Sequence, residues 1–322
     1  MSGEFSIITR EHDETAFLVG IGNIEAVANA DQIRLEAQYR AFLHDDFKDM
    51  SFVVFQDGAA RACVIAYKLD DVCGFGASGV EVYAPVHEKK LIQAILEHLL
   101  QACASESIKT LRVSDHWSQG ALGAVGVEAY NLGALPSVKI RPVVELSRSE
   151  AELRRQVRKS YKSLINQGKR EMGMVYVCQD NPDEKLFHDF REFHFQVAGR
   201  RTRSEESWQM QFEMIKAGCG DLVLGYMEEH GLVSSALFTD FGDVSHYAVA
   251  VYNRELFVDK PLGHAVTFEG ILRAKERGMR LVNMGVIEQK GHVSDKEYNI
   301  GLFKKGFSNT LGNHIEWMFS IA

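Results

Sequence analysis

The sequence predicts an α/β protein that is built from two tandem copies of one unit. Short apolar strands alternate with segments of helical periodicity in both halves, and the landmarks of the two halves occur in the same order. Gly58 and Gly231, in corresponding turns, are 173 residues apart, and Pro85 and Pro261, before corresponding helices, are 176 apart. The closing strands are offset by 170 residues. A single internal duplication explains all three offsets.

The first half contains the complete order of elements once. Strands are expected at 51–55, 61–67 and 72–75, with a tight hairpin turn at 56–58 between the first two. Apolar residues then recur at helical spacing from 91 to 103, and TLRV at 110–113 is an apolar closing strand.

The second half repeats this order. Strands are expected at 221–227, 232–241 and 244–252, the last two joined by the two-residue turn Gly242-Asp243. A helix at about 262–277 and a closing strand at 280–285 follow. The polar stretch SRSE at 147–150 is the expected boundary, which divides the chain into domains 1–148 and 149–322.

Composition narrows the class of protein. The 322 residues suffice for two domains, and 46% hydrophobic with 25% charged residues is typical of a globular chain. No apolar run approaches the roughly 20 residues of a membrane span, and no secretory signal is seen, so we expect a cytoplasmic protein. The five cysteines are scattered without a CxxC pair or a Cys/His cluster, which predicts no metal site, disulfide frame or redox cofactor.

The charge is unevenly distributed. The net charge of −8 argues against a protein that coats nucleic acid non-specifically, yet residues 152–171 carry a local balance of +5. A basic helix at 152–170 is therefore expected at the start of the second unit. Its cations are Arg154, Arg155, Arg158, Lys159, Lys162, Lys169 and Arg170.

Three antiparallel strands, a helix and a parallel closing strand resemble the unit of the GNAT acyltransferases. Two such units in tandem resemble the FemAB family, whose members append amino acids to peptidoglycan precursors, and FemAB-like proteins of polysaccharide gene clusters. The resemblance is carried by VRKSYKSLINQG (157–168), GRRTR (199–203), DKPLGHA (259–265) and EYNIGLFKKGF (297–307). It implies two GNAT-like domains that share a central cleft. The family's long helical arm has no counterpart in the sequence.

The segment 260–265 is the candidate donor site. The resemblance implies that this loop binds the pyrophosphate of coenzyme A, with Lys260, Gly263, His264 and Ala265 as donor-binding residues, although lysine replaces the usual glutamine or arginine. Backbone N–H groups and the positive end of a helix dipole form an anion site, and glycine lets the backbone approach the phosphate. An ordinary helix start after a proline is the alternative. The equivalent segment 85–90 lacks glycine and carries a glutamate, which predicts no donor phosphate site in the first domain.

A second candidate region is the helix that the capping box Ser294–Glu297 predicts at 295–305. The resemblance implies that Tyr298 protonates the departing thiolate, and that Phe303 and Lys304 match a Phe-Lys pair at the donor and transition-state site. His246, in the strand expected to line the acyl site, is a candidate base. The alternatives are that Tyr298 packs in the core, that the lysine is solvated and that the histidine is structural.

Two basic clusters and one loop are candidates for binding the acceptor. Arginine forks suit phosphate and carboxylate groups, although a solvated helix face is the usual explanation of such clusters. The candidate acceptor-binding residues are Arg158, Lys159, Tyr161 and Lys162 in the basic helix, Arg200, Arg201 and Arg203 before the following helix, and Asp115 and His116 after the first closing strand.

Together these features predict an N-acyltransferase that moves an acyl or aminoacyl group from an activated donor to a primary amine of a cell-envelope or polysaccharide precursor. The donor is a co-substrate, and no tightly bound cofactor is expected. Acyl-CoA is favoured by the loop at 260–265 and the acidic overall charge, whereas aminoacyl-tRNA is favoured by the resemblance and the basic helix. The acceptor could be linked to a nucleotide sugar. A non-catalytic module that binds a glycan or peptide precursor is the third interpretation.

Overall fold

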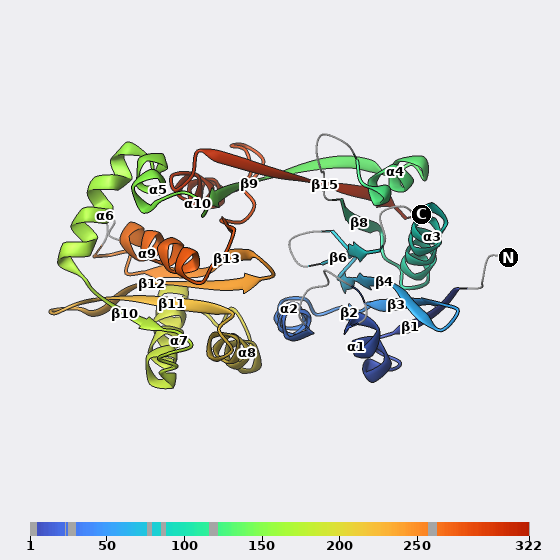
Figure 1. The fold of residues 1–322 in the computed structure, drawn as a ribbon, viewed down its shortest axis with the longest axis horizontal. Coiled ribbons are helices and arrows are strands. Elements are labelled where there is room, and N and C mark those ends of the chain that lie inside the picture. Colours follow the sequence, from blue (N-terminus) through green and yellow to red (C-terminus); the bar gives the residue numbers. More distant parts are fainter. Residues whose placement is uncertain are drawn as a thin grey trace. The chain divides into compact units, whose positions relative to one another are not determined.

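The computed structural model describes residues 5–22, 24, 30–75, 79–84, 88–115, 122–256 and 263–321. The chain forms two compact units, Met1–Lys139 with Asn313–Ala322, and Ile140–Gly312 (Figure 1). This division differs from the expected one at residue 148. The chain enters unit 2 within β9 (Leu135–Glu145) and returns to unit 1 within β15 (Thr310–Ser320).

The difference arises because β9 and β15 do not pair with strands of the unit that precedes them in the chain. β9 follows unit 1 but pairs within unit 2, and β15 follows unit 2 but pairs within unit 1. In unit 1, β15 pairs antiparallel with β8 (Thr110–Asp115), and in unit 2, β9 pairs antiparallel with β14 (Leu281–Asn283). Both pairings cover an edge that would otherwise present unpaired backbone groups. The expected boundary at 147–150 is instead a helix start, where Ser149 and Glu152 form a capping box.

Unit 2 is a six-stranded sheet with helices on both faces. Its strand order in the described part of the chain is β10-β11-β12-β13-β14-β9, in which β13 pairs with β14 in parallel and the other neighbouring strands pair antiparallel. The central strands are β10 (Gly173–Val177), β11 (Gly220–Met227), β12 (Gly231–Phe241) and β13 (Val244–Tyr252). Helix α9 (Gly263–Glu276) covers one face, while α7 (Glu184–Ala198) and α8 (Glu205–Lys216) cover the other (Figure 1). The strands and the helix expected in this half are confirmed to within a few residues.

The expected basic helix at 152–170 is wrong in one respect, because it consists of two helices. Helix α5 (Glu150–Gln156) ends at Val157, and α6 (Lys159–Glu171) begins after Arg158. Both intervening residues are extended rather than helical. The N–H of Arg158 donates to the carbonyl of Gly306 over 2.8 Å, so a tertiary hydrogen bond replaces the one that a continuous helix would make.

Unit 1 has a similar succession of hairpin strands, helix and parallel closing strand, but its described strands are divided between two sheets, so the hairpin and the closing strand do not share one sheet as they do in unit 2. Strands β3 (Phe52–Gln56) and β4 (Ala59–Ile65) form a hairpin whose turn residues Asp57 and Gly58 both have positive φ, 52° and 78°, as a tight hairpin turn requires. β6 (Val72–Gly74) pairs in parallel with β8, and α3 (Lys89–Ser105) lies between them in the chain. The remaining elements are β1 (Phe5–Thr9), α1 (Glu14–Gly22), α2 (Ala30–Leu43), β2 (Phe47–Asp49), β5 (Tyr67–Leu69), β7 (Glu81–Tyr83) and α4 (Ala124–Asn131).

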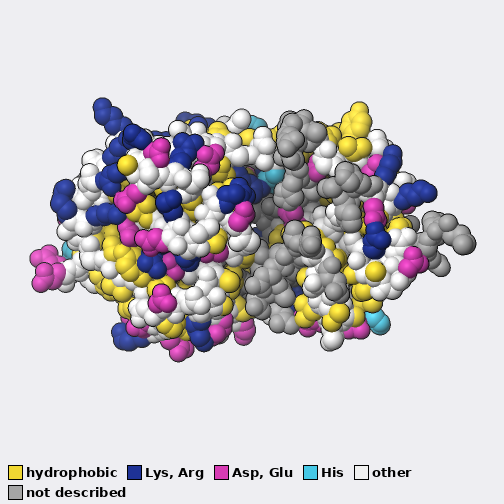
Figure 2. All heavy atoms as spheres, in the orientation of Figure 1, with side chains coloured by type: hydrophobic (Ala, Val, Ile, Leu, Met, Phe, Trp, Pro, Cys, Tyr) yellow, Lys and Arg dark blue, Asp and Glu magenta, His cyan; other side chains and the backbone are white. Residues whose placement is uncertain are grey.

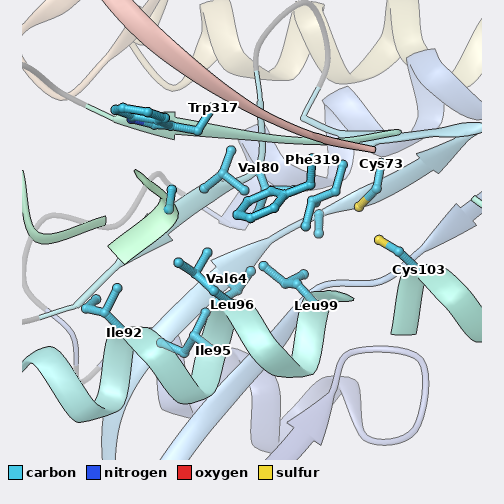
Figure 3. Close-up of a cluster of buried hydrophobic side chains, with 14 of the residues drawn as sticks. Val64, Cys73, Val80, Ile92, Ile95, Leu96, Leu99, Cys103, Trp317 and Phe319 are labelled. Atoms are coloured by element: carbon cyan, nitrogen blue, oxygen red, sulfur yellow. The ribbon is translucent and has the colours of Figure 1, made fainter. Parts of the chain in front are cut away.

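The core of unit 1 forms where α3 packs on the sheet (Figure 3). The helical spacing of apolar residues is confirmed, since Ile92, Leu96 and Leu99 are all buried. Cys73 and Cys103 are also fully buried, and Figure 3 shows their sulfur atoms turned toward each other. A hydrogen bond with Cys103, together with burial, raises the pKa of the Cys73 thiol well above its ordinary value, so this thiol is protonated at neutral pH.

A helix that crosses a bilayer needs about 20 predominantly apolar residues. Within the described ranges, none of the helices is both long and apolar enough to cross a membrane.

A buried ion network fixes the end of α9 to the sheet of unit 2. Asp221 on β11 is bound by Arg273 and Arg277, and Asp240 on β12 is bound by Arg277, with an Nε–Oδ2 distance of 2.6 Å. Both carboxylates are almost fully buried.

We predict that Arg277→Leu lowers the free energy of unfolding by about 3–5 kcal/mol, because Asp240 would remain buried without a cation. The matched control is Arg280→Leu, which removes an exposed pair with Asp243 and should cost less than about 1 kcal/mol. Urea unfolding of both variants measures the difference. Equal losses would show that the buried network adds nothing beyond a surface pair.

Candidate active site

Strands β13 and β14 separate in the middle of the sheet of unit 2. They pair in parallel only through residues 244–246 and 281–283, where β14 ends, while β13 continues to Tyr252. The register between β12 and β13 shifts at the same level, and Ala248 has no counterpart on β12. Beyond His246, therefore, β14 no longer covers this edge of β13, and residues 247–252 of β13 have no partner on β14.

Lys304 lies beside the end of β14. It belongs to α10 (Asp295–Lys305), which begins at the predicted capping box and positions the side chain against Gly285. A β-carbon placed on Gly285 would lie 2.9 Å from Nζ of Lys304. Burial lowers the pKa of this half-buried lysine. Among the residues that the structure describes, no carboxylate forms an ion pair with its ammonium group, whereas the neighbouring Lys305 is exposed to solvent.

The turn after β14 is held by its own hydrogen bond. The N–H of Gly285 donates to Oδ1 of the buried Asn283 over 2.9 Å, and Gly285 has a φ of 85°, which favours glycine. Sequence reasoning did not select either residue. The available signal was the glycine at the end of the expected closing strand 280–285, since glycine readily adopts the left-handed conformation of a turn.

An aromatic cluster brings together residues from three helices. The ring of Tyr161 on α6 lies 4.0 Å from that of His264 on α9 and 6.1 Å from that of Phe303 on α10, between ring centroids. Phe307 closes the cluster, and the Arg158 guanidinium lies 5.1 Å above the Tyr161 ring. Tyr161, expected to bind the acceptor, thus packs against two expected donor-binding residues, the buried His264 and the partly buried Phe303.

The start of α9 is tightly packed. A β-carbon on Gly263 would lie 3.3 Å from Cδ1 of Tyr252, and Ala265 is fully buried in the core under the helix. Ala265 therefore packs against the sheet of its own unit. Lys260 lies outside the described residues.

The two residues expected to transfer protons, His246 and Tyr298, lie on different elements, β13 and α10. His246 is half-buried, with its ring centroid 4.9 Å from that of Phe241, and burial, aided by the charge of Arg141, lowers its pKa to about 4. It is therefore neutral and weakly basic near pH 7. Tyr298 is half-buried in the first turn of α10, six residues before Lys304 and about 120° around the helix from it. The two side chains do not share a face.

The three arginines at 200–203 lie in a different part of unit 2. Arg200, Arg201 and Arg203 line a cavity of about 80 Å³ together with residues of α7 and α8. The Arg203 guanidinium stacks over Trp208 at 4.5 Å, and burial, followed by the charge of Arg203, lowers the pKa of His194 to about 4. Because α7 and α8 pack on the opposite face of the sheet from α9, these arginines and Arg158 are on different faces.

The other cations of the basic segment follow the surface of unit 2. Figure 2 shows lysine and arginine side chains gathered over the part of the unit that contains α5 and α6. Lys159 is exposed, and Lys162 donates to the carbonyl of Arg155 over 3.1 Å.

Asp115 in unit 1 has a structural position. It is buried, and its carboxylate accepts a hydrogen bond of 3.1 Å from the N–H of Gly123, directly before α4. His116 lies outside the described residues. Glu88, at the start of α3, forms an ion pair with Arg61, so a carboxylate lies at the helix end that corresponds to the start of α9.

Comparison with known proteins identifies the fold. No family model matches the sequence, and no curated protein matches it. Among solved structures, FemX has a TM-score of 0.64 at 13% identity, covering 97% of this chain and 96% of that one. The structure of L-PGS from Bacillus licheniformis has a TM-score of 0.59 at 13% identity, covering 90% and 91%. A tandem GNAT protein from the clavulanic acid biosynthesis pathway has a TM-score of 0.53 at 13% identity, covering 99% and 98%.

These similarities extend over nearly the whole of both chains in each pair. The chain therefore has a FemAB-like tandem GNAT fold, and the predicted fold class of two GNAT-like domains is confirmed.

We predict that Gly285→Ala displaces the Lys304 ammonium group, because its β-carbon would occupy the space beside Nζ. The left-handed backbone adds a cost of about 1–2 kcal/mol. Gly291→Ala is the matched control, since Gly291 has a φ of 90° and an added β-carbon there meets nothing. Mass spectrometry after acetic anhydride labelling should show increased modification of Lys304 only in Gly285→Ala. Unchanged labelling would place the ammonium elsewhere.

The lowered pKa of His246 predicts acid sensitivity. Between about pH 6.5 and about pH 4 the unfolded chain binds a proton that the folded chain does not, so the free energy of unfolding should fall as the pH falls through this window. His246→Gln should reduce this fall, whereas the exposed His230→Gln should leave it unchanged. Urea unfolding at pH about 7 and about 4.5 tests the difference. An identical pH dependence in all three proteins would contradict the assignment.

Proposed function

We propose that this chain is an acyltransferase that moves an acyl or aminoacyl group from an activated donor to a primary amine, with the chemistry in unit 2. The observation that carries the proposal is Lys304, a half-buried ammonium without a counter-ion in the described part of the chain, beside the point where β13 and β14 separate. The fold similarity to FemX and to a tandem GNAT protein supports the same class of reaction by analogy.

The reaction requires few protein groups. The amine nitrogen attacks the carbonyl carbon of a thioester or ester, a C–N bond forms, and the C–S or C–O bond to the leaving group breaks. Negative charge develops on the carbonyl oxygen, where Lys304 and the backbone amides of 247–252 would stabilise it. The amine loses a proton to water, and the leaving thiolate or alkoxide gains one. Neutral His246 is too weak a base to be assigned the first of these transfers.

The donor is expected to bind between the start of α9 and α10. Gly263 begins a helix of 14 residues, whose first N–H groups form an anion site, and Phe303 lies one residue before Lys304. These features favour acyl-CoA. The exposed cations of α5 and α6 support aminoacyl-tRNA as the second candidate, since a phosphate backbone binds such a surface.

The acceptor is proposed to be the amine of a cell-envelope or polysaccharide precursor with an anionic group. The cavity lined by Arg200, Arg201 and Arg203 supports this, because arginine forks bind phosphate or carboxylate. Unit 1 is proposed to lack a donor site, since Glu88 at the start of α3 would repel a phosphate.

Native mass spectrometry would test this function directly. The purified protein is incubated separately with acetyl-CoA, an aminoacyl-tRNA and a nucleotide sugar that carries an amine. Binding of one activated donor and formation of an acylated amine are the expected results. Binding of the amine or glycan alone, with no donor retained and no product, would identify a non-catalytic module instead.

We predict that Lys304→Met lowers turnover about a hundred- to a thousandfold, the usual effect of losing one donor to an oxyanion. Lys305→Met is the matched control and should be nearly silent, because Lys305 is exposed and turned about 100° around the helix. Thermal stability of Lys304→Met should be unchanged or higher, since burial of this ammonium is unfavourable. Thiol release from acetyl-CoA in the presence of primary amines measures turnover. Equal effects of the two substitutions would place the catalytic centre elsewhere.

A further inference from the structure

Two neighbouring serines of β12 have hydroxyl groups that the fold leaves unsatisfied. Ser234 and Ser235 are 0% and 1% exposed, and neither Oγ has a hydrogen-bond partner in the part of the chain that the structure describes. A buried hydroxyl without a partner destabilises the folded state, so each such group requires an explanation.

The two hydroxyls point to opposite faces of the sheet, because successive strand residues alternate. Ser235 pairs in register with Leu224 and Val251, which belong to the hydrophobic cluster under α7 and α8. Ser234 pairs with Gly225, where an added β-carbon would contact Val266 of α9. Ser234 is therefore on the face that α9 covers.

Ser234 lies directly under the first residue of α9. Its Oγ is 3.6 Å from the position that a β-carbon on Gly263 would take. The N–H groups in the first turn of a helix have no partner within the helix, and the helix dipole makes this end positive. A buried hydroxyl without a partner among the described residues thus lies close to the first residue of a 14-residue helix, the end at which backbone donors are expected to be free.

We propose that Ser234 is a donor-binding residue, whose hydroxyl donates to a phosphate oxygen that also accepts from the first N–H groups of α9. The proposal rests on the proposed function, because the acyl or aminoacyl donor would bring the phosphate. The pyrophosphate of coenzyme A and the backbone phosphates of a tRNA offer the same oxygen acceptors. Ser235 has no such ligand, since it faces an apolar cluster.

The pair Ser234→Ala and Ser235→Ala provides a matched test. Each substitution removes one unsatisfied buried hydroxyl, so both variants should keep or exceed the thermal stability of the native protein. Isothermal titration with coenzyme A and, separately, with deacylated tRNA measures binding. For the ligand that the native protein binds, Ser234→Ala should raise the dissociation constant about ten- to a hundredfold, because a hydrogen bond to a charged group is lost. Ser235→Ala should bind as the native protein does.

The outcomes separate the two proposals. Weakened binding of coenzyme A alone, or of tRNA alone, supports the role of Ser234 and identifies the donor. If the native protein binds a donor and both variants bind it equally well, the role of Ser234 is overturned while acyl transfer remains. If the native protein binds neither ligand, the proposed function fails, and the proposed role of Ser234 fails with it.

Discussion

The pairing of β13 with β14 ends after three residues, and the arrangement of the candidate site depends on this limit. A longer β14 would cover the edge of β13 and satisfy its backbone groups. Instead, the chain turns at Gly285, where the hydrogen bond to Asn283 fixes a left-handed conformation that favours glycine. The turn leaves room for Lys304 to approach the separated strands from α10. The position of this ammonium is thus a consequence of where one short strand stops.

Some buried charges of unit 2 are neutralised by ion pairs, whereas the charge of Lys304 is not paired with a carboxylate in the described part of the chain. At the end of α9, Arg273 and Arg277 neutralise two buried aspartates, and the network connects the helix to two strands. On α10, beside Gly285, Lys304 is half-buried with no carboxylate partner among the described residues, and burial lowers its pKa. The first arrangement holds the scaffold together. The second keeps a positive charge partly buried without such compensation, which the proposed function would explain as a group that stabilises a developing negative charge.

The aromatic cluster holds together three helices that are distant in the sequence. Tyr161, His264 and Phe303 come from α6, α9 and α10, and their rings are in mutual contact. Gly306 allows Tyr161 to pack against the end of α10, since a β-carbon there would overlap the ring. The hydrogen bond from Arg158 to the same glycine then separates α5 from α6. One contact region therefore shapes three helices and positions the residue next to Lys304.

The sequence by itself determined the elements whose causes are local. The strands of the second half, the capping box before α10 and the turn at Gly242-Asp243 all follow from periodicity and from hydrogen bonds within a few residues. Tertiary structure alone decided that β9 and β15 join the closing strands, that Tyr161 packs with His264, and that the arginines at 200–203 face away from α9. These features depend on partners more than a hundred residues away or on which face of a sheet a helix covers. Local sequence patterns contain neither kind of information. They indicate which side of a helix or strand is apolar, but not which other segment packs against that side.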